Sequence, residues 1–313
     1  MRIPPGKQAP ITAGYLHPDY CRSLSEFGTS RLLPECGGWI LERQIPDSQH
    51  VDAMGCYPLF QCQDWSRLQH DLESVGNGLV SVTVVTDALA ECDQELLRRC
   101  FPDLCAPFKE HFVVDLTRQL ETFVHPHHRR NARKAQRAMS IERCASPIDF
   151  LDEWVNLYAV LVRRHQITGI SAFSRAAFAK QLVVPGIEMF RATHEGMPMG
   201  IVLWYRQGSC AYYHLGAYSD KGYELGASFG LFDFAIKHFA DAGTEWLNLG
   251  SSAGVSAAAT DGLGRFKKGW STGVRTAYLC GRILDRPRYD ELVETRGVGS
   301  TNYFPAYRAG EFS

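Results

Sequence analysis

Apolar and polar positions alternate along the chain in a way that predicts strands and helices in turn. In the first part, strand-like runs at 39–45, 79–85 and 112–116 are separated by helical stretches at 64–75 and 91–100. The run at 79–85 is rich in β-branched residues, mainly valine, which favour a pleated strand. The first part is therefore expected to be a mixed α/β unit.

The pattern changes after residue 117. From Arg118 the chain is helical and unusually basic as far as Arg137, with Pro126 marking a kink or a new helix start. We therefore expect a domain boundary here, with residues 1–117 as the N-terminal half and residues 118–313 as the C-terminal half.

A serine–proline pair at 146–147 is typical of a helix start. After it, apolar residues recur at helical spacing, and these are Trp154, Leu157, Tyr158 and Leu161. Such a stripe favours core packing over a cofactor site.

A second helix, starting at Ser174, precedes three strand-like runs at 187–193, 200–205 and 210–217. Glycine-containing turns join these runs, which predicts an antiparallel meander.

A loop punctuated by glycines, at 221–227, leads into a helix that ends near Gly243. Strands are expected at 246–249 and 275–284. No short-period repeat is visible, which excludes a solenoid.

Composition narrows the class of protein. The 313 residues, 45% hydrophobic and 21% charged, suit two modules or one large one and exclude a disordered or fibrous chain. The formal net charge of -1 excludes a polyanion-binding field over the whole surface, but allows a local basic patch.

The chain has no stretch of about 18 apolar residues, and the two basic residues in Met1–Pro10 are not followed by an apolar run. We therefore expect a cytoplasmic protein without a membrane span. The ten cysteines lack the C-x2-C pairing of zinc modules, which favours buried reduced thiols. The histidines at 125, 127 and 128 are not spaced as a zinc site, so no metal is expected.

Three local sequences together resemble one family. The segments 128–135 (HRRNARKA), 212–217 (YYHLGA) and 265–270 (RFKKGW), the last within the stretch 261–270, are similar to the FemAB-like branch of the GNAT acyltransferase superfamily. The resemblance extends from about residue 112 to residue 278. It implies an α/β fold of α+β type, with a GNAT-like mixed sheet flanked by helices and two GNAT-like halves in tandem.

The resemblance also implies a reaction. Peptidoglycan-bridge enzymes of this branch transfer an aminoacyl group from aminoacyl-tRNA to a peptide amine, whereas related members use acyl-CoA. We therefore expect an N-acyltransferase with acyl-CoA or aminoacyl-tRNA as co-substrate and no tightly bound cofactor. The acceptor would be a small-molecule or peptide amine, and tRNA would be a partner if it carries the donor. The oligomeric state and the contribution of the N-terminal half to the site stay open.

Acyl transfer to an amine requires an exposed donor carbonyl, a group that stabilises the oxyanion, and a path for the ammonium proton. A covalent nucleophile is not required, and the chain has no G-x-S-x-G elbow. Phe266 and Lys267 match a phenylalanine–lysine pair at the aminoacyl end of the donor in the bridge-forming enzymes. The match implies that Lys267 stabilises the tetrahedral intermediate. The alternatives are a surface lysine, or a shift of the role to Lys268.

His214 and Tyr212 lie on the central strand of the predicted meander. Strict alternation places Tyr212, His214 and Gly216 on one face, and the residues at 213, 215 and 217 on the other. A neutral imidazole at 214 would take the amine proton, and a tyrosine would protonate the leaving group. The alternative is a structural histidine.

The glycine-punctuated loop occupies the position where a GNAT enzyme holds the donor pyrophosphate on backbone N–H groups. The candidate donor-binding residues are Lys221, Gly222, Gly226, Ala227 and Ser228. With Gly226 as the first glycine of the motif, Tyr223 replaces its glutamine or basic residue, which weakens the prediction of CoA. The alternative is an ordinary loop before a helix.

The basic helix supplies candidates for an acceptor or polyanion site, namely Arg129, Arg130, Arg133 and Lys134. With Arg137, they would bind tRNA phosphates, a phosphorylated carrier or a nucleotide-linked acceptor. The alternatives are a solvated helix face, or a catalytically silent GNAT-like module that binds nucleic acid or a partner here. The aromatic tail at 303–308 either covers the cleft or docks on the core.

Overall fold

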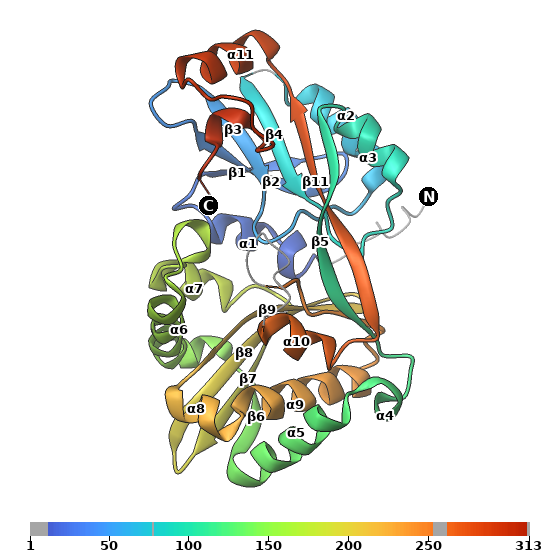
Figure 1. Cartoon of the computed structure of the whole chain (residues 1–313), viewed down its shortest axis with the longest axis vertical. Coiled ribbons are helices and arrows are strands. Elements are labelled where there is room, and N and C mark those ends of the chain that lie inside the picture. Colours follow the sequence, from blue (N-terminus) through green and yellow to red (C-terminus); the bar gives the residue numbers. More distant parts are fainter. Residues whose placement is uncertain (1–11, 77, 253–261, 312–313) are drawn as a thin grey trace, which may run out of the picture.

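The computed structural model describes residues 12–76, 78–252 and 262–311. Within them, one sheet of 11 strands runs in the order β1-β2-β3-β4-β11-β5-β10-β9-β8-β7-β6 (Figure 1). The strands are β1 (Thr29–Leu33), β2 (Gly38–Gln44), β3 (Val51–Gly55), β4 (Leu79–Val85), β5 (Leu104–Asp115), β6 (Ser140–Cys144), β7 (Ile187–His194), β8 (Met197–Gln207), β9 (Cys210–Tyr218), β10 (Trp246–Asn248) and β11 (Gly273–Ile283).

Helices cover both faces of this sheet. They are α1 (Pro18–Ser23), α2 (Leu68–Ser74), α3 (Gln94–Cys100), α4 (Leu120–Phe123), α5 (Pro126–Ala138), α6 (Leu151–His165), α7 (Arg175–Gln181), α8 (Asp220–Leu225), α9 (Ala227–Asp241), α10 (Gly262–Lys268) and α11 (Arg286–Thr295). The expected α/β fold, with a mixed sheet flanked by helices, is confirmed.

The second half of the sheet has two cores, one on each face. On one face, α1, α6 and α7 pack through residues such as Tyr20, Trp154 and Phe178. On the other face, α5 and α9 pack through residues such as Ala135 and Phe232, and the core there includes Trp270, just after α10. A third core lies between α2, α3 and the strands of the first half.

The long strands β5 and β11 connect the two halves (Figure 1). β11 pairs antiparallel with β5 along its length and with β4 at its end, while the end of β5 pairs with β10. One sheet thus contains strands from both sides of the expected boundary at residue 117. Strand β11, from the C-terminal part of the chain, pairs with strands of the first half. The division at residues 117 and 118 stays a prediction.

The prediction of a loop at 221–227 is wrong, because most of this segment forms the helix α8. The hydroxyl of Ser219 accepts a hydrogen bond from the Gly222 N–H, which caps the start of this helix. Gly222 also packs directly on β8, where a Cβ would lie 1.8 Å from the carbonyl oxygen of Met199. Close packing on the sheet therefore selects a helix at a position where glycines suggest an open loop.

The C-terminal tail docks on the first half. Arg308 is buried, and its guanidinium donates to the carboxylate of Asp52 on β3 at 2.5 and 2.8 Å. The Tyr307 hydroxyl bonds to Ser81 on β4 at 2.7 Å and donates to Asp52 at 3.1 Å. Of the two readings of the tail, the structure supports docking on the core.

No helix in the described ranges is long and apolar enough to cross a membrane. The ten cysteines are free thiols, seven of them buried. In the same ranges, no group of three or more histidine, cysteine or acidic side chains is arranged to hold a metal ion.

Candidate functional site

The strands β9 and β10 separate near the centre of the molecule. They pair in parallel only from Cys210 to Tyr212 and from Trp246 to Asn248. β9 then continues beside β8 as far as Tyr218, while the chain leaves β10 after Asn248. A crevice beyond the carboxyl ends of parallel strands that separate is a common place for ligands. We call the point after Tyr212 and Asn248 the strand gap.

Lys267 reaches the strand gap from α10. The residue is 5% exposed, and its ammonium donates a hydrogen bond of 2.7 Å to the carbonyl oxygen of Ser251. The ammonium lies 5.6 Å from the centre of the Tyr213 ring. Gly250 has a φ of +75°, and a Cβ there would lie 3.2 Å from the ammonium. The neighbouring Lys268 is exposed, so the structure buries only the first of the two lysines.

Phe266 fixes α10 against the neighbouring helices. Its ring lies 4.8 Å from the ring of Phe232 and 5.1 Å from that of Phe229, both on α9. Its carbonyl oxygen lies 2.9 Å from Nε2 of His128 on α5, and only an N–H at that nitrogen can make this bond. Burial lowers the pKa of His128, which favours the neutral ring. Phe266 therefore positions Lys267 through packing.

His214 lies in the aromatic core under α1 and α7. Nδ1 is 3.0 Å from the hydroxyl of Tyr15, and Nε2 is 3.3 Å from Oε1 of Gln181. Burial lowers the pKa of His214 to about 3, which keeps the ring neutral. With both nitrogens engaged by core residues, this position favours the structural role.

Tyr212 donates a hydrogen bond of 2.7 Å to Asp87, in the loop after β4. The same carboxylate accepts from Gln61 at 2.9 Å and from the backbone N–H of Leu89 at 2.9 Å. Burial raises the pKa of Asp87, while these donors favour its charged form. Tyr212 is thus part of a buried polar network that joins the two halves of the sheet.

The expected alternation along β9 holds as far as His214, which shares the face of Tyr212, and is wrong beyond it. The register with β8 shifts between Leu203 and Trp204, so the β9 strand contains one extra residue at this point. A Cβ at Gly216 would meet the hydroxyls of Tyr213 and Tyr218, which places Gly216 on the opposite face from Tyr212. A bulge moves every later side chain to the other face, and a strict period of two cannot reveal it.

His111 and Asn248 are the site residues that the sequence did not single out. His111, 8% exposed on β5, has its Nδ1 3.1 Å from Oδ1 of Asn248. The same oxygen accepts the N–H of Gly250 at 2.8 Å. In the sequence, each of the two residues lies only at or near a predicted strand, and the sheet order brings them together.

The pKa of His111 is lowered to about 4. Burial is the main cause, with smaller contributions from the charges of Lys267 and Lys109, and the bond to Asn248 opposes them. Lys267 is therefore close enough to affect the imidazole electrostatically. An ammonium and a neutral histidine thus share the strand gap.

Several of the candidate donor-binding residues are engaged in local contacts. Lys221 is exposed and pairs with Glu224 at 3.0 Å, and Gly222 faces β8. The N–H groups of Gly222, Tyr223 and Gly226 are bonded within the same short segment. Ala227 is fully buried and Ser228 partly buried at the start of α9.

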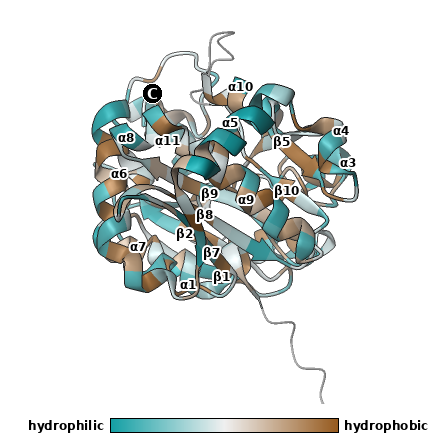
Figure 2. Cartoon of the chain, turned by 90° about the horizontal axis from the view of Figure 1, so that it is seen from below, coloured by the Kyte–Doolittle hydropathy of each residue, from teal (hydrophilic) through white to brown (hydrophobic). Residues whose placement is uncertain are grey.

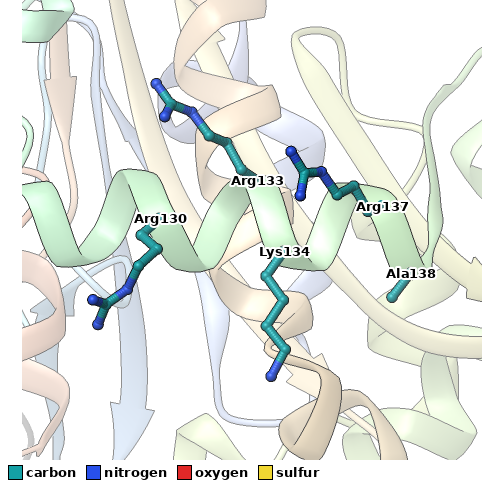
Figure 3. Close-up of a pocket in the computed structure, with 5 residues that line it drawn as sticks. All are labelled: Arg130, Arg133, Lys134, Arg137 and Ala138. Atoms are coloured by element: carbon teal, nitrogen blue, oxygen red, sulfur yellow. The ribbon is translucent and has the colours of Figure 1, made fainter.

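The basic residues of α5 form an open cationic surface. Arg130, Arg133, Lys134 and Arg137 are exposed and, with Ala138, line a concavity of about 440 Å³ (Figure 3). None of these four forms an ion pair with an acidic residue that the structure describes. In Figure 2 the helix is mostly hydrophilic. Arg129 is only partly buried and donates to the carbonyl oxygen of Glu121 at 3.3 Å.

Comparison with known proteins gives a domain match over part of the chain and a fold. Residues 126–267 match the family described as acetyltransferase (GNAT) domain. No curated protein matches the chain. The crystal structure of FemX is similar with a TM-score of 0.65 and 13% identity, over 90% of this chain and 95% of FemX.

Two further solved structures share the fold. The C-terminal domain of a putative lysylphosphatidylglycerol synthetase from Agrobacterium fabrum has a TM-score of 0.60 at 17% identity, over 88% of this chain and 91% of that domain. L-PGS from Bacillus licheniformis has a TM-score of 0.55 at 17% identity, over 94% of this chain and 100% of that structure.

Proposed function

We propose that this chain is an acyltransferase that transfers an acyl or aminoacyl group to an amine by direct attack. The match of residues 126–267 to a GNAT acetyltransferase domain and the FemX-like fold support this proposal. The observation that carries the proposal is the buried ammonium of Lys267 at the strand gap. The acceptor is a small-molecule or peptide amine.

Lys267 would act on the charge that develops during attack. When an amine adds to the donor carbonyl, the carbonyl oxygen becomes an oxyanion, and a buried cation stabilises it more strongly than water does. The bond to the Ser251 carbonyl and the packing of Phe266 hold the ammonium in place before the reaction. Little reorganisation is then needed when the oxyanion forms.

Two observations favour aminoacyl-tRNA over acyl-CoA as the co-substrate. The segment before α9 uses its N–H groups internally, which leaves fewer of them for a pyrophosphate. The exposed cations of α5 offer a surface of the kind that binds nucleic-acid phosphates. Both donors belong in the test.

The proposal is tested with purified protein and two donors, alanyl-tRNA and acetyl-CoA, against glycylglycine and L-lysine as amine probes. We expect amide formation with release of deacylated tRNA, and a melting temperature unchanged by CoA. Release of free thiol, with a CoA-dependent rise in melting temperature, would reassign the donor. No amide from either donor with either amine would contradict the proposed function for these substrate classes.

Neutralising the cationic surface of α5 is expected to weaken binding of alanyl-tRNA. A variant with Arg130, Arg133, Lys134 and Arg137 all replaced by glutamine loses up to four phosphate contacts. Each such contact in the wild type releases counterions that are condensed on the nucleic acid. A plot of the logarithm of the association constant against the logarithm of the salt concentration has a negative slope, and its magnitude should decrease by about 3–4. Filter binding at 50–200 mM salt measures it.

The matched control replaces four exposed cations on other helices, Arg98, Arg163, Arg175 and Lys180, by glutamine. This variant keeps the binding and the salt slope of the wild type if α5 is the contact surface. An equal loss of binding in both variants would leave only a net-charge effect, and the assignment to α5 would fail.

The same cationic surface supports a second candidate, a catalytically silent module that binds nucleic acid through α5. It predicts salt-dependent RNA binding without turnover, unchanged by Lys267→Met. Amide formation that depends on Lys267 would exclude this alternative.

A further inference from the structure

The hydrogen bonds around Asn248 fix the protonation of His111. A backbone N–H can only donate, so the bond from Gly250 identifies the atom that it reaches as the amide oxygen of Asn248. This oxygen also faces Nδ1 of His111 at 3.1 Å, and two acceptors do not bond to each other. The proton of the neutral imidazole therefore lies on Nδ1, and Nε2 carries a lone pair.

Nε2 is the ring nitrogen that remains available. It makes no hydrogen bond to any residue that the structure describes, whereas His214 and His128 use Nε2 in bonds to core or backbone atoms. His111 keeps 8% of its surface exposed. An imidazole with one nitrogen anchored and the other unbonded is the arrangement of a general base.

His111 and Lys267 approach the strand gap from opposite faces of the sheet. Side chains alternate along β5, so His111 shares the face of Val113, which packs in the core with α6 and α7. Val114 faces the core of α5 and α9, where Phe266 also packs and from which Lys267 extends. A carbonyl in the gap would have the ammonium on one side and the imidazole on the other.

From this geometry we propose that His111 is the general base of the transfer reaction, and that Asn248 is the positioning residue that fixes its tautomer. The inference rests on the proposed function, because it assigns the proton path of that same reaction.

The proposed step balances as follows. The neutral amine attacks the donor carbonyl carbon, a C–N bond forms, and the carbonyl π electrons move to the oxygen beside Lys267. Nε2 of His111 takes the proton from the resulting ammonium and becomes imidazolium. The oxyanion then restores the C=O bond, and the bond to the ribose oxygen of the tRNA, or to the sulfur of CoA, breaks. The imidazolium returns the proton to that leaving group, which gives amide, free hydroxyl or thiol, and neutral histidine.

The surroundings of the ring favour its neutral form. Burial, with smaller contributions from Lys267 on α10 and Lys109 on β5, lowers the pKa of His111, and Asp87 lies close enough to Asn248 for that side chain to affect its pKa. With a pKa of about 4, the imidazole is neutral and able to accept a proton throughout the range above about pH 5. Since the neutral form is the base, the contribution of His111 to the rate is lost as the pH falls through its pKa, well below the pH at which the attacking amine itself becomes protonated.

The test compares His111→Gln with wild type in the donor assay above, using L-lysine or glycylglycine, whichever reacts, and methoxyamine as a second nucleophile. We expect kcat with the alkyl amine to fall by about 10²–10³-fold. The loss should be much smaller with methoxyamine, because its adduct is a far stronger acid and gives its proton to water. A merely structural role would reduce both rates equally, which would overturn the inference.

The control is His194→Gln, at the far end of β7, where the ring bonds to the carbonyl oxygen of Ala138. It keeps the wild-type rate with both nucleophiles. Transfer by wild type together with an unchanged rate in His111→Gln would reject the base and leave the proposed function intact.

A measurement without turnover tests the tautomer separately. Long-range ¹H–¹⁵N NMR of the protein labelled at histidine, assigned with His111→Gln, should show protonated Nδ1 and unprotonated Nε2 for His111 from pH 5.5 to 8. A proton on Nε2 in that range would exclude the general base even if transfer occurs. If no donor reacts but the tautomer is as expected, the proposed function fails, and the general base, which exists only in that reaction, fails with it.

Discussion

Replacing Lys267 by methionine is expected to lower kcat by about 10²–10³-fold, while the KM for the amine changes little. The loss is that of a preorganised charge which acts mainly on the oxyanion of the transition state. Methionine keeps much of the side-chain volume, so the packing of α10 against Phe232 should be retained. Steady-state kinetics with the donor and amine found for wild type measure the effect, and the melting temperature checks the fold.

Lys268→Met provides the matched control for this prediction. It removes the same charge one position along the same helix, but Lys268 is exposed, where water screens its charge. We expect wild-type kcat for this variant. A larger loss for Lys268→Met than for Lys267→Met would assign the role to the other lysine of the pair, and equal losses would indicate an effect of α10 as a whole.

Arg308→Met is expected to lower the free energy of unfolding by about 3–5 kcal/mol. The side chains of Arg308 and Asp52 are 4% and 1% exposed, so loss of the guanidinium leaves a carboxylate buried without its main partner. The double variant Asp52→Asn with Arg308→Met removes both charges and should recover part of the loss. Chemical denaturation monitored by tryptophan fluorescence gives these values.

An exposed ion pair is the control for the tail. Arg288 and Glu291 lie 3.3 Å apart on α11 with side chains 50% and 62% exposed, and Arg288→Met should cost no more than about 1 kcal/mol. A similarly small cost for Arg308→Met would mean that the tail is held by Tyr307 and its neighbours rather than by the charge pair. The rate of transfer should be unaffected at temperatures where the variant is folded, because the tail docks on β2 to β4, away from the strand gap.

Local pattern was sufficient for much of the secondary structure. The β-branched run at 79–85 coincides with β4, and the stripe that includes Trp154 and Tyr158 is buried in α6, because side-chain periodicity and core packing express the same geometry. The segments 128–135 and 265–270 identified the GNAT domain, which residues 126–267 match. The first residue of the stretch 261–270, Asp261, lies outside the described residues.

Several other features depended on contacts between distant segments. Helix α8 replaced an expected loop because Gly222 packs on β8, and the bulge in β9 exchanged the faces of Gly216 and its neighbours. Neither a close approach to another strand nor an extra residue in a ladder leaves a periodic signal in the chain.

The sequence by itself determined that this protein has a mixed α/β fold with a GNAT-type domain, and it singled out Lys267 with Phe266. Only the tertiary structure buried Lys267 and exposed Lys268, moved His214 into the core and placed His111 beside Asn248. The reason is physical. Helices and strands form through interactions between neighbours in the chain. Burial, the tautomer of His111 and the shared site depend on contacts between distant segments, since His111 and Asn248 are 137 residues apart in sequence but lie on adjacent strands of the sheet.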